Sequence, residues 1–278
     1  IGLKSLVLMI FSAIFGFSNS LTAYYQMGYA SIVWYIITAI LFFLPSALIF
    51  AEYGAAFKGV KGGIFSWLKG SVSEKTAFIG TFIWLAAWVV WLVSSTQFFL
   101  VSVSTAISGH DTTQSWHFLN LTSTQLLGIL EVVFLVVVTF FAAKGVDKIA
   151  AGSNVGGLFT LAITIGFTLG SILVFFLNHW KLAEPLTAQS LVHSPNPAFQ
   201  SPIAVVSFIV YALFAYGGLE TSAGVIDSVD KPEKTFPKAL ITAMIWMTAL
   251  YVLNILMCGV AANWSSQLSG KNVDLANV

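Results

Sequence analysis

Charged residues are scarce in this sequence, and arginine is absent altogether. Asp, Glu and Lys make up 8% of the 278 residues, where a soluble domain carries about 25% charged residues. The net charge is +1 and there is no basic arm or tail, so nothing predicts nucleic-acid binding. Cysteine is nearly absent too, because the single Cys258 excludes both a disulfide framework and a thiol pair for metal or redox chemistry. The composition therefore argues against a soluble domain.

Histidine is missing from every long apolar run. The four histidines, His110, His117, His179 and His193, fall in polar connections. A membrane-embedded enzyme would need a nucleophile–base pair or metal ligands at depth, and the apolar runs supply neither. His110 and His117 lack companion ligands at a metal-binding spacing, so we expect solvated loop histidines. We predict no enzymatic activity, no cofactor and no metal site.

Long apolar runs take up most of the chain. Hydrophobic residues make up 58% of it and aromatic residues 15%, with a mean hydropathy of +0.89. Runs of about 20 residues are long enough to cross a bilayer, and lipid offers backbone groups no partners, so each run is expected to be helical. We predict an all-α polytopic membrane protein with seven spans, at residues 3–27, 30–57, 76–108, 124–143, 149–178, 202–226 and 237–262.

The lysines predict the orientation of these spans. With the N-terminus in the cytoplasm, ten of the twelve lysines fall on the cytoplasmic side, which is the bias of the positive-inside rule. Only Lys181 and Lys271 then lie outside. The ten inside are Lys4, Lys58, Lys61, Lys69, Lys75, Lys144, Lys148, Lys231, Lys234 and Lys238. The basic connection 58–75 has two interpretations, a short helix along the inner membrane face or a plain loop.

Two spans contain residues that interrupt a helix. In the first span, FSAIFGFSNS at 11–20 places a glycine and three small polar residues within an apolar run, and in the sixth, FAYGGLE at 214–220 places two glycines before an acid. Small residues in mid-span often serve close helix packing. Here the interruptions are five spans apart, as an inverted repeat of five helices would place them, and paired broken helices indicate a transporter's binding site.

The chemistry of such a site follows from the backbone. A broken helix frees N–H and C=O groups, which is tolerated only where they face protein, water or a ligand. Freed N–H groups at a helix start attract a carboxylate, and freed carbonyls at a helix end attract an ammonium group. Two breaks side by side could therefore hold an α-amino acid by both of its charged ends.

Several motifs carry a resemblance to a known family. Gly16-Phe17-Ser18 in span 1, FAYGGLE at 214–220 and DKPEKTFP at 230–237 resemble the broken helices and inner loop of the amino-acid/polyamine/organocation (APC) superfamily. AEYGAAF at 51–57 and GGIFSWL at 62–68 resemble the end of the family's second helix and its inner loop. The stretch MIFSAIFGFSNS at 9–20, with AYYQMGY at 23–29, is similar to the glutamate/GABA antiporter-like branch.

This resemblance implies a LeuT-like inverted-repeat fold with broken helices 1 and 6. Residues 1–178 would form the first five-helix repeat, and residues 179–278 the start of the second. Because relatives usually have about twelve spans, we expect this chain to be a truncated form with about seven. The first break reads Gly-Phe-Ser where many relatives have two glycines, so Phe17 is expected to narrow the site.

The breaks define the predicted substrate site. The resemblance implies that Phe214 acts as a thin gate over the substrate and that Glu220 takes part in coupling. The predicted substrate-binding residues are Phe15, Gly16, Phe17, Ser18, Asn19, Phe214, Tyr216, Gly217 and Gly218. Two further acids have more than one interpretation. Glu52 is an interfacial ion partner or a gating residue, and Glu131 faces either the helix bundle or a partner subunit.

These features predict a secondary active transporter. The expected substrate is an amino acid or a related small amino compound, moved across the bacterial inner membrane by exchange or proton coupling with alternating access around the two breaks. The partners are then the substrate, the lipid bilayer and protons, with no nucleic acid. The alternative is a non-transporting fragment or remnant of such a permease.

Overall fold

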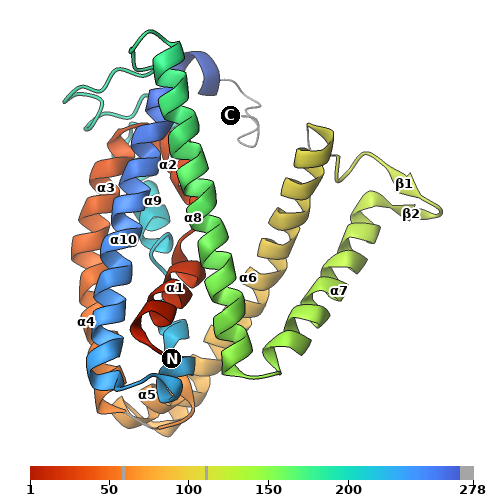
Figure 1. The fold of residues 1–278 in the computed structure, drawn as a ribbon, viewed down its shortest axis with the longest axis vertical. Coiled ribbons are helices and arrows are strands. Elements are labelled where there is room, and N and C mark those ends of the chain that lie inside the picture. The colour runs from red at the N-terminus through yellow and green to blue at the C-terminus, as the bar shows by residue number, and fades with distance from the viewer. Residues whose placement is uncertain (58–59, 110–111, 270–278) are drawn as a thin grey trace. The chain divides into compact units, whose positions relative to one another are not determined.

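The structure is a computed structural model that describes residues 1–57, 60–109 and 112–269 (Figure 1). It divides into two compact units. Unit 1 contains the described residues of Ile1–Gly63 and Ala150–Val273, and unit 2 contains those of Ile64–Ile149. Three residues with roles in the sequence predictions, Lys58, His110 and Lys271, lie outside the described residues.

Unit 1 contains both interrupted spans. The first consists of α1 (Leu3–Ile14) and α2 (Phe17–Met27), which meet at an angle of 43°. The second span runs without a gap through α3 (Ala30–Thr38), the π-helix η1 (Ala39–Phe43) and α4 (Leu44–Ala56). The later elements are α8 (Val146–Leu177, of which Val146–Ile149 belong to unit 2), η2 (Pro197–Phe199), α9 (Pro202–Phe214), η3 (Leu219–Ser228), α10 (Pro232–Ala261) and η4 (Trp264–Leu268).

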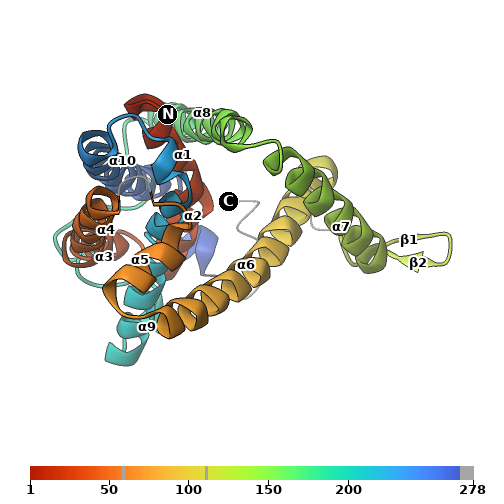
Figure 2. The same ribbon diagram turned by 90° about the horizontal axis from the view of Figure 1, so that it is seen from below.

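Helix α10 packs against α1, α2, α3 and α4. Figure 2 shows it from below, beside α1 and α4. Large aromatic side chains fill the space between these helices, and five of them are tyrosines exposed by 2% or less. A buried hydroxyl needs a partner, and each of the five donates to a backbone carbonyl. These tyrosines are Tyr24, Tyr29, Tyr35, Tyr216 and Tyr251.

The two ends of unit 1 are closed by contacts between distant segments. At one end the amino group of Ile1 donates to Ser228 O at 2.6 Å and lies 3.7 Å from the Asp230 carboxylate. At the other end Glu184 accepts from Trp264 N at 2.9 Å and donates its own N–H to Gly259 O at 2.8 Å. The start of α1 and the end of η3 therefore lie together.

Unit 2 is a helical hairpin with a short helix before it. It contains α5 (Gly63–Ser71, of which Gly63 belongs to unit 1), α6 (Glu74–Ser108), the paired strands β1 (His117–Phe118) and β2 (Leu121–Thr122), and α7 (Ser123–Ala142). The strands are antiparallel, with Phe118 opposite Leu121. The side chain of Ser73 caps α6, and Thr122 forms a capping box with Gln125 at the start of α7. Within the connection 58–75 the expected short helix is α5, and its position along the inner membrane face stays a prediction.

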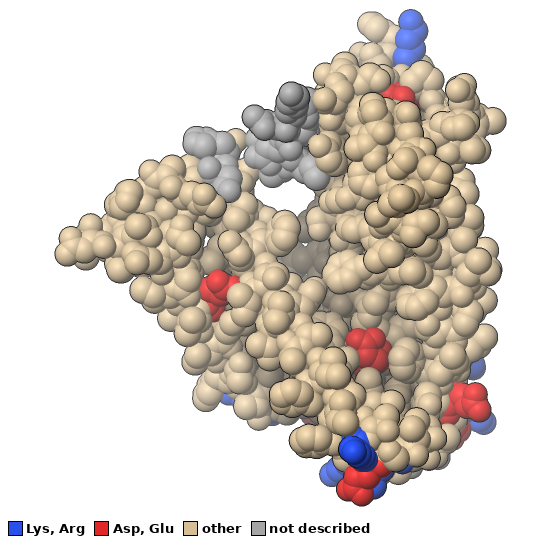
Figure 3. Space-filling model, turned by 180° about the vertical axis from the view of Figure 1, so that it is seen from behind, with Lys and Arg blue, Asp and Glu red and all other residues tan. Residues whose placement is uncertain are grey.

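The described helices confirm the predicted spans. Six are long and apolar enough to cross a membrane, and the bent pair α1–α2 makes a seventh. Charged atoms are few on the face in Figure 3. The largest shift of a boundary is at α10, which begins at Pro232 and not at 237: proline is tolerated in the first turn of a helix, and α10 continues through Pro237. The division into repeats at residue 178 stays a prediction, since compact units and symmetry repeats need not coincide.

Candidate functional site: two helix breaks joined by a tyrosine

The first break separates α1 from α2 by two extended residues. Phe15 has ψ 111°, and Gly16 has φ −101° and ψ 111°, so neither continues the helix. The last carbonyls of α1 and the first N–H groups of α2 consequently have no partners within a helix. The side chain of Asn19 lies over the glycine, since a Cβ at Gly16 would come within 2.8 Å of its amide nitrogen. Any larger residue at Gly16 would have to displace Asn19.

The second break follows α9 and has a different geometry. Gly217 N donates to Phe214 O at 2.9 Å, and Gly218 then turns the chain with φ +116°, a value that favours glycine. The chain continues as η3, a 3₁₀-helix of ten residues. Stretches of 3₁₀-helix longer than three or four residues are uncommon, and within a span they often mark a hinge.

Direct contacts bring the two breaks together. A Cβ at Gly218 would lie 3.3 Å from Ile14 Cγ1 and 3.7 Å from Ala13 O, so the second break is in contact with the end of α1. The hydroxyl of Tyr251, on α10, joins both. It accepts a hydrogen bond from Gly16 N at 3.2 Å and donates one to Ala215 O at 2.9 Å. One fully buried side chain therefore pairs with a freed N–H group at one break and a carbonyl at the other.

Aromatic rings surround this junction. The Tyr251 ring lies 4.7 Å from Phe15, 5.0 Å from Tyr35 and 5.4 Å from Tyr216, centroid to centroid. Phe43, from the π-helix in span 2, stacks on Tyr216 at 4.8 Å. Tyr216 also donates to Tyr35 O at 3.2 Å. Because aromatic faces attract ammonium groups, this environment suits the amino end of a substrate.

The structure separates the predicted site residues into two groups. Phe15, Tyr216 and Gly218 are buried in the junction, and Gly16 and Asn19 are half-buried beside it. Asn19 O accepts from Tyr35 Oη at 3.3 Å, and Asn19 Oδ1 accepts from Tyr211 Oη at 3.4 Å.

The remaining predicted residues lie at the periphery of the junction. Half-buried Phe17 packs edge-on against Phe167 of α8, with 5.4 Å between ring centroids. Ser18 and Gly217 are exposed, and Phe214 is 59% exposed. Phe214 therefore does not cover the junction in this structure, and its gating role stays a prediction.

The three membrane acids occupy different surroundings. Glu220 is half-buried in the first turn of η3, where a negative charge is favoured by the helix start. Glu52 is exposed on α4, one turn before that helix ends. Glu131 lies on α7 in unit 2 and has a buried carboxylate oxygen without a hydrogen-bond partner among the described residues.

Comparisons with known proteins agree with this architecture. A model of the amino acid permease family matches residues 1–277. The inner membrane transporter YjeM of Escherichia coli (strain K12) is 43% identical over 276 residues, which cover 99% of this chain and 55% of YjeM. The aspartate/glutamate permease AcaP of Lactococcus lactis subsp. cremoris (strain MG1363) is 22% identical over 231 residues, 83% of this chain and 45% of AcaP.

A third relative is the glutamate/gamma-aminobutyrate antiporter of the same Lactococcus strain. It is 24% identical over 252 residues, which cover 86% of this chain and 47% of the antiporter. The chain thus spans about half the length of the curated relatives it matches. The expected likeness to the APC superfamily and its glutamate/GABA antiporter branch is confirmed, and this chain, a multi-pass membrane protein, belongs to the amino acid permease family.

Proposed function

We propose that the protein transports an amino acid or a related small amino compound across the bacterial inner membrane, and that the two helix breaks hold the substrate. The observation that carries the proposal is the junction at Tyr251, where one hydroxyl pairs with Gly16 N–H and Ala215 C=O. These groups have the polarity that a carboxylate and an ammonium group require. In this structure the tyrosine therefore bonds to the two backbone groups that a substrate would bind once the breaks move apart.

Coupling and orientation form part of the same proposal. Glu220 sits at the start of η3, directly after the second break, where a change in its protonation would alter the charge beside the substrate. We assign it to proton coupling, with exchange of two substrates as the alternative mode. The N-terminus is placed in the cytoplasm on the lysine bias. Lys4 near the start of α1 and Lys231 before α10 belong to the end of unit 1 where Ile1 meets Asp230, as this orientation requires.

The substrate site is tested by filling the second break. Gly218→Val adds a side chain where φ is +116° and Ile14 Cγ1 is 3.3 Å away, and Gly217→Val adds one that meets Phe214 O at 3.2 Å. In the purified full-length protein we expect both variants to bind radiolabelled substrate at least about tenfold more weakly, a loss of about 1.4 kcal/mol. The panel contains glutamate, aspartate and 4-aminobutyrate, taken from the names of the two Lactococcus relatives.

A matched control separates loss of the site from loss of the fold. Gly170→Val on α8 makes the same chemical change where no atom lies within 4 Å of the new Cβ. This variant should keep wild-type affinity, and all three should elute as single species in size-exclusion chromatography. Wild-type affinity in both Gly217→Val and Gly218→Val would place the substrate elsewhere.

A further inference from the structure

Unit 2 contains a polar cavity that the proposed transport site does not use. It has a volume of about 250 Å³ and lies between α6, α7 and the connection that joins them. Its polar lining consists of Gln97, Thr113, Gln114, Thr124 and Glu131. Leu100 and Leu127 supply apolar walls. Such a mixture of polar and aliphatic groups within two membrane-spanning helices is typical of a ligand site rather than of a lipid-facing surface.

Glu131 is the charged residue of this cavity. Its Oε1 atom is buried and has no hydrogen-bond partner among the described residues, and no lysine lines the cavity. An ionisable group within a membrane span is costly and is usually paired or functional. The other polar lining groups are neutral amides and hydroxyls, which cannot balance a carboxylate charge. The described lining residues therefore offer the Glu131 carboxylate no cationic partner.

Several contacts lie at the edges of the cavity. Ser104 Oγ on α6 lies 2.7 Å from Thr112 Oγ1 and accepts from Thr112 N at 3.1 Å, which fastens the connection to α6. Ser123 N donates to Trp116 O at 2.9 Å, which fastens the other end of the connection to α7. Phe99 stacks on Phe134 with centroids 5.7 Å apart and fixes the distance between the two helices. These contacts join α6, α7 and their connection at the edges of the cavity.

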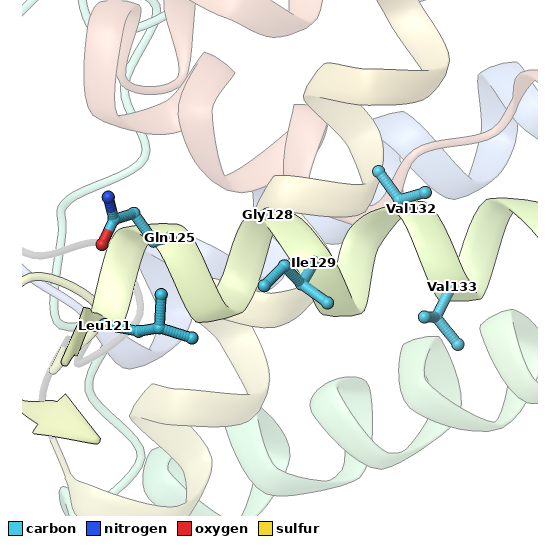
Figure 4. Close-up of a pocket in the computed structure, with 6 residues that line it drawn as sticks. All are labelled: Leu121, Gln125, Gly128, Ile129, Val132 and Val133. Carbon is cyan, nitrogen blue, oxygen red and sulfur yellow. The ribbon is translucent and has the colours of Figure 1, made fainter. Parts of the chain in front are cut away.

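A neighbouring groove on α7 has the opposite character. It is lined by Leu121 at the end of β2 and by Ile129, Val132 and Val133 along α7, as Figure 4 shows. Gly128 lines both the groove and the cavity, so the polar and apolar surfaces meet along α7. The groove is suited to lipid tails, whereas the cavity carries the buried carboxylate.

We propose that this cavity binds a small organic primary ammonium compound. The ammonium group would pair with Glu131 and donate its remaining hydrogens to the Gln97 and Thr124 oxygens, since it has three donors and no acceptor. A few methylene groups would contact Leu100 and Leu127. The volume is far larger than the roughly 30 Å³ that a water molecule occupies, and it falls below the range of about 300–1,000 Å³ for drug-sized ligands. The proposal is independent of the substrate site, because every lining residue belongs to unit 2.

A thiol reporter tests the site in the full-length protein. Gln114 is exposed and lines the cavity, so Gln114→Cys provides a reactive thiol there while Gln97, Thr124 and Glu131 stay in place. The background carries Cys258→Ala and has any cysteine outside these 278 residues replaced as well. We expect n-butylammonium chloride to slow modification by maleimide in a saturable manner. Sodium chloride and n-butanol at equal concentrations should not, because the first lacks the carbon chain and the second lacks the charge.

The decisive comparison is between two Glu→Gln variants. Glu131→Gln keeps the size of the side chain and should raise the half-protecting concentration at least about tenfold, because hydrogen bonds to charged groups are worth more than neutral ones. Glu74→Gln removes an exposed acid that pairs with Lys69 at 3.1 Å and should change nothing. If Glu131→Gln aggregates, Gln97→Leu replaces it and should also weaken protection. The proposal would be overturned if n-butylammonium protected the thiol equally well in the cavity variants and in the parent protein. Equal protection by n-butanol or sodium chloride would overturn it too.

Discussion

Replacing Tyr251 by phenylalanine removes one hydroxyl that contacts both helix breaks. The ring keeps its contacts with Phe15, Tyr35 and Tyr216, so the change isolates the two hydrogen bonds to Gly16 N and Ala215 O. A buried polar group left without a partner costs about 1–3 kcal/mol. If no water molecule bonds to either backbone group, the free energy of unfolding of the substrate-free protein should fall by about 2–6 kcal/mol, the sum of two such losses.

The substrate should restore part of this loss. In our proposal the substrate's carboxylate and ammonium group bind the freed backbone groups, so saturating substrate should stabilise Tyr251→Phe more than the wild type. The assay is thermal unfolding of the full-length protein, followed by tryptophan fluorescence with and without substrate. In soluble domains of 150–250 residues about 1 kcal/mol shifts Tm by roughly 2–4 °C, so a drop of several degrees is expected.

A second tyrosine provides the control for this experiment. Tyr24 is as buried as Tyr251 and donates to Ala262 O at 3.0 Å, two turns along α2 from the first break. Tyr24→Phe should lower Tm as well. The rise in Tm that saturating substrate causes should be no larger in this variant than in the wild type. Unchanged stability in Tyr251→Phe, or a loss that substrate does not reduce, would refute the assignment of these backbone groups to the site.

Two further predictions concern topology and coupling. In a Cys258→Ala background, a cysteine at exposed Ser115 should react with an impermeant thiol reagent in intact cells, and one at exposed Ser71 should not; the reverse pattern would invert the orientation. Glu220→Gln keeps shape but cannot titrate, so it should retain substrate binding and lose the pH dependence of transport by the full-length protein in liposomes. An unchanged pH profile would leave Glu220 with a structural role alone.

The sequence predicted the parts of this fold that depend on solvent and on local backbone chemistry. Apolar runs defined the spans because lipid requires helices of that length, and Gly16 and Gly218 marked the breaks because glycine is destabilising within a helix. The helix formed by η3 was expected, but its 3₁₀ geometry was not. The hydrogen-bonding pattern of a short segment depends on what packs around it, and the local residues do not encode that.

The residues that join the breaks were missed for a related reason. Tyr251 and Tyr35 lie in apolar runs, where a tyrosine is usually an ordinary packing residue. Their roles arise from contacts with partners far away in sequence, such as Gly16 and Ala215 for Tyr251. One signal was available: a tyrosine buried in a span must find a hydrogen-bond acceptor. Phe214 shows the converse, because nearness in sequence to the break did not bring its ring into the junction.

The 3₁₀ geometry of η3 also has a mechanical consequence. A 3₁₀-helix rises about 2.0 Å per residue and an α-helix about 1.5 Å, so the ten residues of η3 would shorten by about 5 Å on conversion to α-helix. The number of residues per turn would change from 3.0 to about 3.6, which unwinds the segment by roughly half a revolution. Such a conversion would draw Ser228, and the Ile1 amino group that it holds, toward the second break. A change of helix type would thus couple a translation along the helix axis to a rotation about it, between the middle of the span and its lysine-bearing end.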